Sequence, residues 1–108
     1  MTMENQLFDK DNEDLAAIML CRAKDAISTE LDGETVILNI ETGVYNGLDQ
    51  VGTTIWNLIE KPISFGDLTE GVMAEYEVDA ERCSDDLCSF LNDMLQNKLI
   101  EIRNNGSD

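Results

Sequence analysis

The sequence predicts an α+β fold in which a three-stranded antiparallel sheet is followed by three helices, in a winged helix-turn-helix-like order. Two observations predict it. β-Branched runs separated by short turns fill residues 26–48, and apolar residues at helical spacing dominate residues 49–97. The 108 residues fit one domain with a modest core. We expect that domain over residues 14–103, between a disordered acidic N-terminal tail at 1–13 and a flexible C-terminal tail at 104–108.

The predicted strands follow a segment that the pattern leaves undecided. Residues 15–22, LAAIMLCR, are too short an apolar run to distinguish a helix from a strand. The runs AISTEL and ETVILNI are then separated by Asp32-Gly33, a strong hairpin signal. In the second run Val36, Leu38 and Ile40 share one face. After a turn at ETG, the run VYNGL completes a meander of three strands.

The helical part begins with Asp49, which is placed to cap a helix that Pro62 ends. A weak capping box, Ser64 with Asp67, opens a second helix. The apolar stripes of these two helices are Val51, Ile55, Leu58 and Ile59 in the first and Leu68, Val72 and Tyr76 in the second.

The third helix follows the short turn EVD, is capped by Asp79 and runs to about Asn97. A final short strand is expected at LIEI, residues 99–102. Two helices joined by so short a turn can form a helix-turn-helix, with the small sheet beside them as a wing.

The charge balance argues against nucleic acid as a partner. There are 23 acidic and 7 basic residues, a formal net charge of −16, and such a surface repels phosphates. The polar positions of the third helix hold four acids and one base, namely Glu81, Arg82, Ser84, Asp85, Asp86, Ser89, Asn92 and Asp93. No apolar run reaches the ~20 residues that span a bilayer, and the acidic start is no signal peptide. We therefore expect a cytoplasmic protein that binds neither nucleic acid nor membrane.

The side chains offer little for catalysis. The sequence contains no histidine, and its glycines form no phosphate-binding loop. Cys83 and Cys88 would lie roughly 140° apart on a helix, so they cannot converge on a metal. We expect these two and Cys21 to be buried thiols. The sequence thus predicts a protein without enzymatic activity, metal or cofactor.

Binding through a sheet edge is the alternative to catalysis. A third strand at the edge, facing the apolar third helix, would form a groove for an extended peptide. Backbone bonds would supply affinity and alternate side chains would supply specificity. The competing interpretation assigns the apolar residues of the helix to the core, and we expect roughly half of them there.

Three runs carry a resemblance to a known family: VILNIETGVYNGLDQVGTTIWNLIE, SFGDLTEGVMAEYEVD and CSDDLCSFLNDMLQNKLIEI. In this order and spacing they resemble the PqqD-like family, the leader-peptide-binding domains also called RiPP recognition elements. The resemblance covers about residues 22–102. It implies a peptide chaperone that binds the leader of a ribosomally made precursor as an added strand. Such a protein presents the precursor to a modifying enzyme, such as a radical SAM protein, a peptidase or a cyclase.

Carried over residue by residue, the resemblance implies a binding strand and a binding helix face. The strand is Val44, Tyr45, Asn46, Gly47 and Leu48, and the helix face is Cys83, Asp86, Leu87, Phe90, Leu91 and Met94. Gly52 and Trp56 match the family's structural positions, Gly for close packing and Trp for the core.

The sequence departs from the family pattern at three places. Asp49 replaces an asparagine and still caps a helix, whereas Lys98 replaces a glycine and leaves the third helix with a less comfortable end. Asn46-Gly47 is a strong turn signal inside the third strand, so a short or bulged strand is expected there.

Two other functions are compatible with the residues alone. One is a winged-helix module in transcription or protein interaction, and the other is a dimerisation domain whose free edge pairs with a second copy to form a homodimer. The sequence leaves the precursor, the product and the partner enzyme open.

Overall fold

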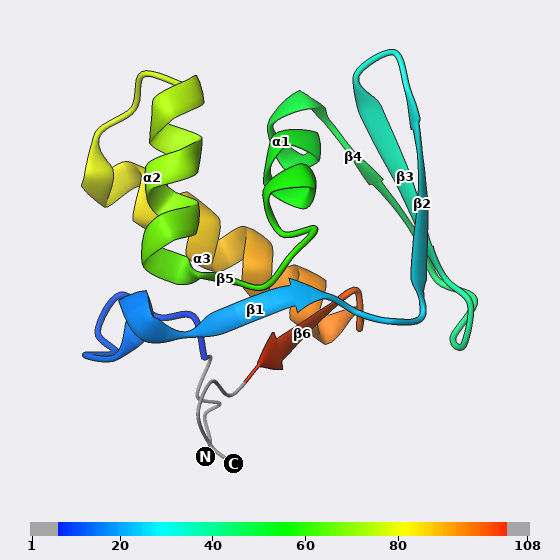
Figure 1. The fold of residues 1–108 in the computed structure, drawn as a ribbon, viewed down its shortest axis with the longest axis horizontal. Coiled ribbons are helices and arrows are strands. Elements are labelled where there is room, and N and C mark those ends of the chain that lie inside the picture. Colours follow the sequence, from blue (N-terminus) through cyan, green and yellow to red (C-terminus); the bar gives the residue numbers. More distant parts are fainter. Residues whose placement is uncertain (1–6, 104–108) are drawn as a thin grey trace.

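The computed structural model describes residues 7–103, which form two small antiparallel sheets and three helices (Figure 1). A short 3₁₀ turn at Leu15–Ala17 precedes them. The strands are β1 (Met19–Arg22), β2 (Ala26–Leu31), β3 (Glu34–Asn39), β4 (Tyr45–Leu48), β5 (Ile63–Ser64) and β6 (Ile100–Arg103). The helices are α1 (Gln50–Leu58), α2 (Phe65–Glu75) and α3 (Ala80–Gln96).

The predicted meander is the sheet with strand order β2-β3-β4. Asp32 and Gly33 connect its first two strands with φ angles of 55° and 82°, as a two-residue hairpin turn requires. The side chains of Thr35, Ile37 and Asn39 are buried beneath the sheet. Val36, Leu38 and Ile40 share the opposite face, as the sequence indicates, and Val36 and Ile40 are exposed there.

The second sheet corrects the prediction of a single sheet. Its order is β5-β1-β6, and β1 pairs with segments more than forty residues away along the chain. The undecided segment 15–22 divides into the 3₁₀ turn and β1, while the expected final strand is found as β6. β5 has only two residues, too few for a period of two to appear in the sequence.

Each predicted helix cap is present. The carboxylate of Asp49 accepts a hydrogen bond from the Gly52 amide at 2.9 Å, which satisfies a donor in the first turn of α1. The Ser64 hydroxyl oxygen accepts from the Asp67 amide at the start of α2. At the start of α3 the Asp79 carboxylate accepts from the amide of Arg82. The three helices therefore begin where the sequence predicts.

The described part of the predicted tail at 1–13 begins at Leu7. Phe8 is only 1% exposed, and its ring stacks on that of Phe65 with 6.0 Å between centroids. The side-chain amide of Asn92 in α3 accepts from the Phe8 amide and donates to the Phe8 carbonyl, at 3.2 and 2.8 Å. Residues 7–13 thus pack on the domain, whereas residues 1–6 and the expected C-terminal tail at 104–108 lie outside the described residues.

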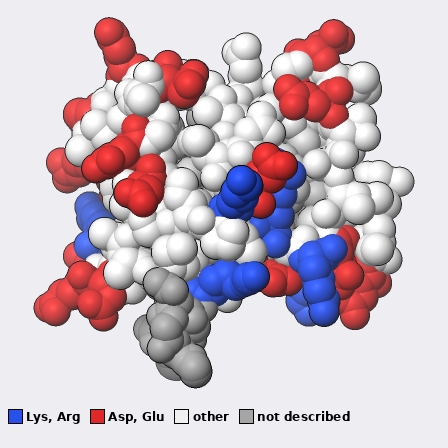
Figure 2. Space-filling model, in the orientation of Figure 1, with Lys and Arg blue, Asp and Glu red and all other residues white. Residues whose placement is uncertain are grey.

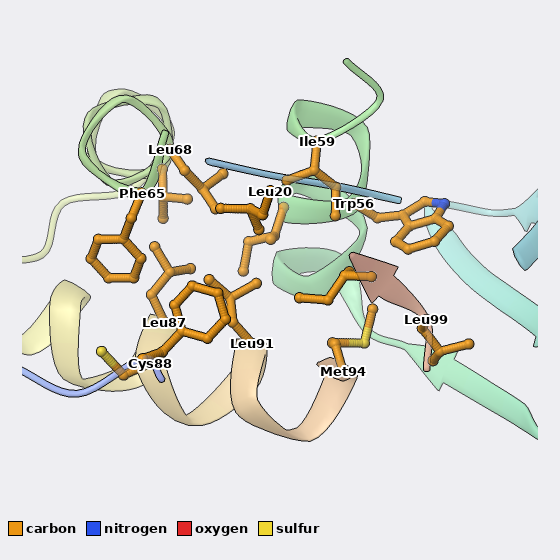
Figure 3. Packing of buried hydrophobic residues seen from close by; sticks show 14 of the residues in the cluster. Leu20, Trp56, Ile59, Phe65, Leu68, Leu87, Cys88, Leu91, Met94 and Leu99 are labelled. Atoms are coloured by element: carbon orange, nitrogen blue, oxygen red, sulfur yellow. The ribbon is translucent and has the colours of Figure 1, made fainter. Parts of the chain in front are cut away.

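The core lies between the helices and the β5-β1-β6 sheet (Figure 3). Leu87, Leu91 and Met94 point from α3 toward the other labelled core residues. From the opposite side, Leu20 of β1, Ile59 after α1 and Leu68 of α2 complete it, and all three are fully buried. No helix in the described part of the chain is long and apolar enough to cross a membrane.

Trp56 joins α1 to both sheets. Its ring is 1% exposed, its Nε1 donates to the Ser28 hydroxyl of β2 at 3.0 Å, and the Arg22 guanidinium of β1 lies 4.5 Å from the ring centroid. The same guanidinium donates to the Trp56 carbonyl from Nε and Nη2. Trp56 is therefore a core residue, as the sequence predicts.

The end of α3 is the place where Lys98 departs from the family pattern. Lys98 has φ 63°, in the left-handed region that glycine adopts most easily. The Lys98 amide donates to the Leu95 carbonyl and the Leu99 amide to the Met94 carbonyl, which is the Schellman pattern. The helix thus ends with the backbone geometry of a glycine cap and a lysine in its place.

We predict that Lys98→Gly stabilises the protein by about 1 kcal/mol, because it removes the left-handed penalty of an L-residue and only part of that gain is offset in the unfolded chain. The free energy of unfolding from urea titration measures the change. Lys98→Ala is the control, since it removes the same charge and keeps the strained φ. Equal stability of the two variants would show that backbone strain at this position is negligible.

Candidate functional site

β4 is an edge strand of the β2-β3-β4 sheet. Asn39 donates its amide proton to the Val44 carbonyl, and the register continues with Ile37 opposite Asn46. Hydrogen-bonded and non-hydrogen-bonded pairs alternate in an antiparallel ladder, so Asn46 faces β3 with its backbone groups. The N–H and C=O groups of Tyr45 and Gly47 therefore point to the free edge.

Two contacts connect the surroundings of β4 to α3. At one end the Asn39 side chain donates to the Lys98 carbonyl at 2.7 Å. At the other end, a Cβ built on Gly52 would lie 3.1 Å from Leu48 Cβ and 3.4 Å from Phe90 Cε1, so the strand and the helix meet at this glycine. The start of β4 therefore lies near the residues that end α3, and Leu48 at its other end lies near Phe90 of α3.

A pocket of about 360 Å³ opens at the Leu48 end of this strand, between the three helices. The hydroxyls of Thr54 in α1 and Tyr76 after α2 are hydrogen-bonded at 2.9 Å and tie these two elements together beside it. The lining residues are mostly apolar: Asp49, Val51, Gly52 and Ile55 from α1 and its cap, Val72, Tyr76 and Val78 from α2 and the turn after it, and Cys83, Asp86, Leu87 and Phe90 from α3.

The residues that the sequence assigned to the helix face divide into two groups. Cys83, Asp86, Leu87 and Phe90 line the pocket. Leu91 and Met94, with 0% and 2% exposure, lie in the core and do not line it (Figure 3). In the strand, Val44, Tyr45 and Gly47 are exposed, Asn46 is half-buried and Leu48 is buried.

Sequence reasoning missed the pocket wall that α1 and α2 supply. Val51, Ile55, Val72 and Tyr76 belong to the predicted apolar stripes, which by themselves indicate only a core face. The exposure of Val51 in the first turn of α1 is what distinguishes the pocket wall from an ordinary core face. This exposure depends on how the helices pack. The apolar stripe of a helix, taken from the sequence, does not show which of its residues are covered by other helices and which line a pocket.

The Asn46-Gly47 pair forms no turn. Both residues lie within β4, and both pair with β3 in regular register, Asn46 with Ile37 and Gly47 with Val36. Only Asp32, Gly33, Gly43 and Lys98 have positive φ among the described residues. The expected short strand is observed, with four residues, and the paired residues show no bulge. The actual turn is at Gly43, with φ 76°.

The pocket carries negative charge at its rim. Asp49 and Asp86 are its only charged lining residues, and the adjacent first turns of α3 hold three further acids beside one base, namely Asp79, Glu81, Asp85 and Arg82. Acidic side chains also gather over the left-hand part of the molecule (Figure 2), which is the side of α2 and α3. The site is therefore suited to an apolar group that is accompanied by positive charge.

The cysteines are buried free thiols, as the sequence predicts. Burial raises the pKa of the Cys83 thiol, and the neighbouring Asp86 carboxylate raises it further. Burial likewise raises the pKa of Cys21 and Cys88. These thiols are neutral apolar groups at neutral pH. Within residues 7–103, no group of three or more Cys, Asp or Glu side chains is arranged to hold a metal ion.

Comparison with known proteins gives two matches. Residues 34–100 match the family model described as coenzyme PQQ synthesis protein D (PqqD). The solved structure of TbiB1 in complex with the TbiA(beta) leader peptide is similar, with a TM-score of 0.70 and 33% sequence identity over 82% of this chain and 99% of that chain. A search of curated protein sequences gave no significant match.

We predict that stability decreases as the pH rises above the ordinary thiol pKa of about 8.5. The folded pKa values of the three cysteines are raised, so the unfolded chain releases these protons first and ionisation favours unfolding. The contribution of the buried thiols to the free energy of unfolding is complete below the thiol pKa of the unfolded chain. It is lost as the pH rises toward the raised thiol pKa values of the folded protein. Urea titrations from about pH 7 to about pH 10 measure it.

Reaction with a thiol reagent at about pH 8 gives an independent measurement of the same burial. The three native thiols should react slowly, while Ser89→Cys, at an exposed position of α3, should add one fast thiol as an internal control. Fast reaction of all thiols in the native protein would contradict the burial.

Proposed function

Because the chain belongs to the PqqD family, we propose that it binds the leader segment of a ribosomally made precursor peptide and presents that peptide to a modifying enzyme. Members of this family are non-catalytic peptide-binding proteins. The observation that carries the proposal is the free edge of β4, which ends close to an apolar pocket lined by α1, α2 and α3. We place this binding in the cytoplasm, where a ribosomally made precursor is first available.

The leader adds as a strand on β4. The outward N–H and C=O groups of Tyr45 and Gly47 pair with the backbone of the peptide, and Val44 and Leu48 flank them. Backbone pairing of this kind supplies affinity without reading the sequence of the leader. Specificity has to come from the side chains that the added strand turns toward the helices.

One apolar side chain of the leader fills the pocket. Cys83, Leu87 and Phe90 form the wall on α3, and Val51 and Ile55 form the wall on α1. Asp49 and Asp86 at the rim favour a lysine or arginine close to the apolar residue in the leader. Leu91 and Met94 support the helix from the core side and do not touch the peptide.

We infer that α2, the short turn and α3 form the helix-turn-helix that the sequence predicts, with the β2-β3-β4 sheet as its wing. In a DNA-binding protein α3 would enter the major groove. Here the exposed positions of α3 include Glu81, Asp85, Asp86 and Asp93, with Arg82 as the basic exception. Like charges would oppose its approach to phosphates, and the same arrangement serves peptide binding instead.

We predict that Gly47→Pro weakens leader binding about tenfold or more. Proline removes the N–H that points to the free edge without removing a bond to β3, and it leaves a carbonyl of the guest strand without a donor. Gly47→Ala is the matched control, because a Cβ at this position meets no atom within 4 Å. Fluorescence anisotropy with a labelled cognate precursor peptide measures both affinities.

Amide shifts locate the same binding independently. Titration of the precursor into labelled protein should shift the amides of residues 43–48 and 83–94. Equal affinity of Gly47→Pro and Gly47→Ala, or binding that leaves these amides unmoved, would refute strand addition on β4.

We predict that Val51→Asp also weakens leader binding by about tenfold, because it places a third carboxylate beside an apolar side chain that must be buried. Val51 is exposed in the first turn of α1, where an acidic residue is compatible with the helix dipole, so the fold tolerates the change. Val51→Thr keeps the shape of the side chain and should reduce leader affinity less than Val51→Asp. Unchanged affinity of Val51→Asp would remove this pocket from the binding site.

A further inference from the structure

The exposed apolar side chains of the described chain are concentrated on one sheet. Six of the eight large ones lie between residues 27 and 45, in or beside β2, β3 and β4. Among them Ile27, Val36 and Tyr45 are 54%, 45% and 70% exposed. The concentration matters because single exposed apolar residues are common, whereas a contiguous group marks an interaction surface.

The strand register places these residues on a single face. Ile27, Leu38 and Tyr45 are direct neighbours across the three strands, and Thr29, Val36 and Gly47 form the next row. Side chains alternate along each strand, so both rows point away from the buried residues Thr35 and Ile37. We call this surface, made of Ile27, Thr29, Val36, Leu38 and Tyr45, the outer sheet face.

No described element covers the outer sheet face. α1 lies on the other side of the sheet, and nothing is drawn beyond β2 and β3 on the side away from the helices (Figure 1). An antiparallel sheet with one face in water normally carries polar residues there. Threonine would preserve the strand equally well, so strand propensity does not explain a row of isoleucine, leucine and tyrosine.

The charges around this face indicate what covers it. Glu30, Asp32 and Glu34 surround the tip of the β2-β3 hairpin, and Glu41 follows Ile40 at the other end of the sheet. Figure 2 shows acidic atoms at the upper right and again, beside basic atoms, at the lower right, with a mostly uncharged area between them. A second copy of the chain would bring a further net charge of −16 toward these acids.

We propose that the outer sheet face docks a protein surface with an apolar centre and a lysine- and arginine-rich rim. Resting on the proposed function, this partner is the modifying enzyme that receives the peptide. The face lies on the opposite side of the sheet from α1 and the apolar pocket. One domain can therefore hold the leader at the edge of β4 and the enzyme on the outer sheet face at the same time.

The test uses the full chain, its labelled precursor peptide and the purified modifying enzyme encoded in the same gene neighbourhood. The double variant Ile27→Thr/Val36→Thr keeps β-branched residues and removes apolar surface. It should weaken enzyme binding about tenfold or more and leave peptide affinity unchanged. Leu7→Thr is the matched control, an exposed apolar residue outside the sheet.

Glu34→Lys should also weaken enzyme binding, and raising the NaCl concentration should weaken binding by the wild type.

The outcomes separate this inference from the proposed function. Peptide affinity measured by anisotropy reports on β4, and enzyme affinity measured by biolayer interferometry reports on the outer sheet face. Full enzyme binding by the double variant, or no enzyme binding by the wild type, would overturn the inference while peptide binding stands. A wild-type dimer in sedimentation velocity that the double variant abolishes would also overturn it, because the face would then join two copies of the chain.

Discussion

The side chain of Asn39 connects two parts of the chain that are 59 residues apart. Its amide nitrogen donates to the Lys98 carbonyl after α3, and its oxygen accepts from the amides of Glu41 and Thr42 in the loop before β4. The Asn39 side chain is almost fully buried, so water competes little for its own polar atoms. Asn39 thus links the turn that leads into β4 to the turn that ends α3, because both turns are bonded to its side chain.

Trp56 and the Thr35–Thr53 pair make similar connections on the same face of the sheet. The two threonine hydroxyls are 2.9 Å apart and buried, and they join β3 to α1. Trp56 joins α1 to β2 and, through Arg22, to β1. The sheet is thereby supported from one side only, which leaves the edge of β4 and the outer sheet face accessible. The proposed binding of a peptide and an enzyme at the same time requires this division of the surfaces.

Features of the fold that depend on interactions between residues close together in the chain could be predicted from the sequence, whereas features that depend on distant residues could not. Asp49, Ser64 and Asp79 act within four residues of themselves, so the starts of all three helices could be predicted, and the Asp32-Gly33 turn could be predicted for the same reason. β1 and β5 form only through pairing with distant segments, so the second sheet could not be predicted. Asn46-Gly47 has a strong local preference for a turn, but it forms part of a strand because pairing with β3 outweighs that preference. In the candidate site the strand and the α3 wall followed from the family pattern, whereas the walls from α1 and α2 depend on helix packing.

The short length of β4 bears on how fast a guest strand dissociates. Between Val44 and Leu48 only two residues turn their backbone groups outward, so a guest strand gains few bonds, each of modest net strength. Affinity differences between related complexes arise chiefly in the dissociation rate, and few bonds shorten the residence time of the guest. In the proposed function, a short lifetime of the complex would favour release of each peptide after it has been processed. One molecule of the protein can then serve a succession of precursors instead of being consumed by the first.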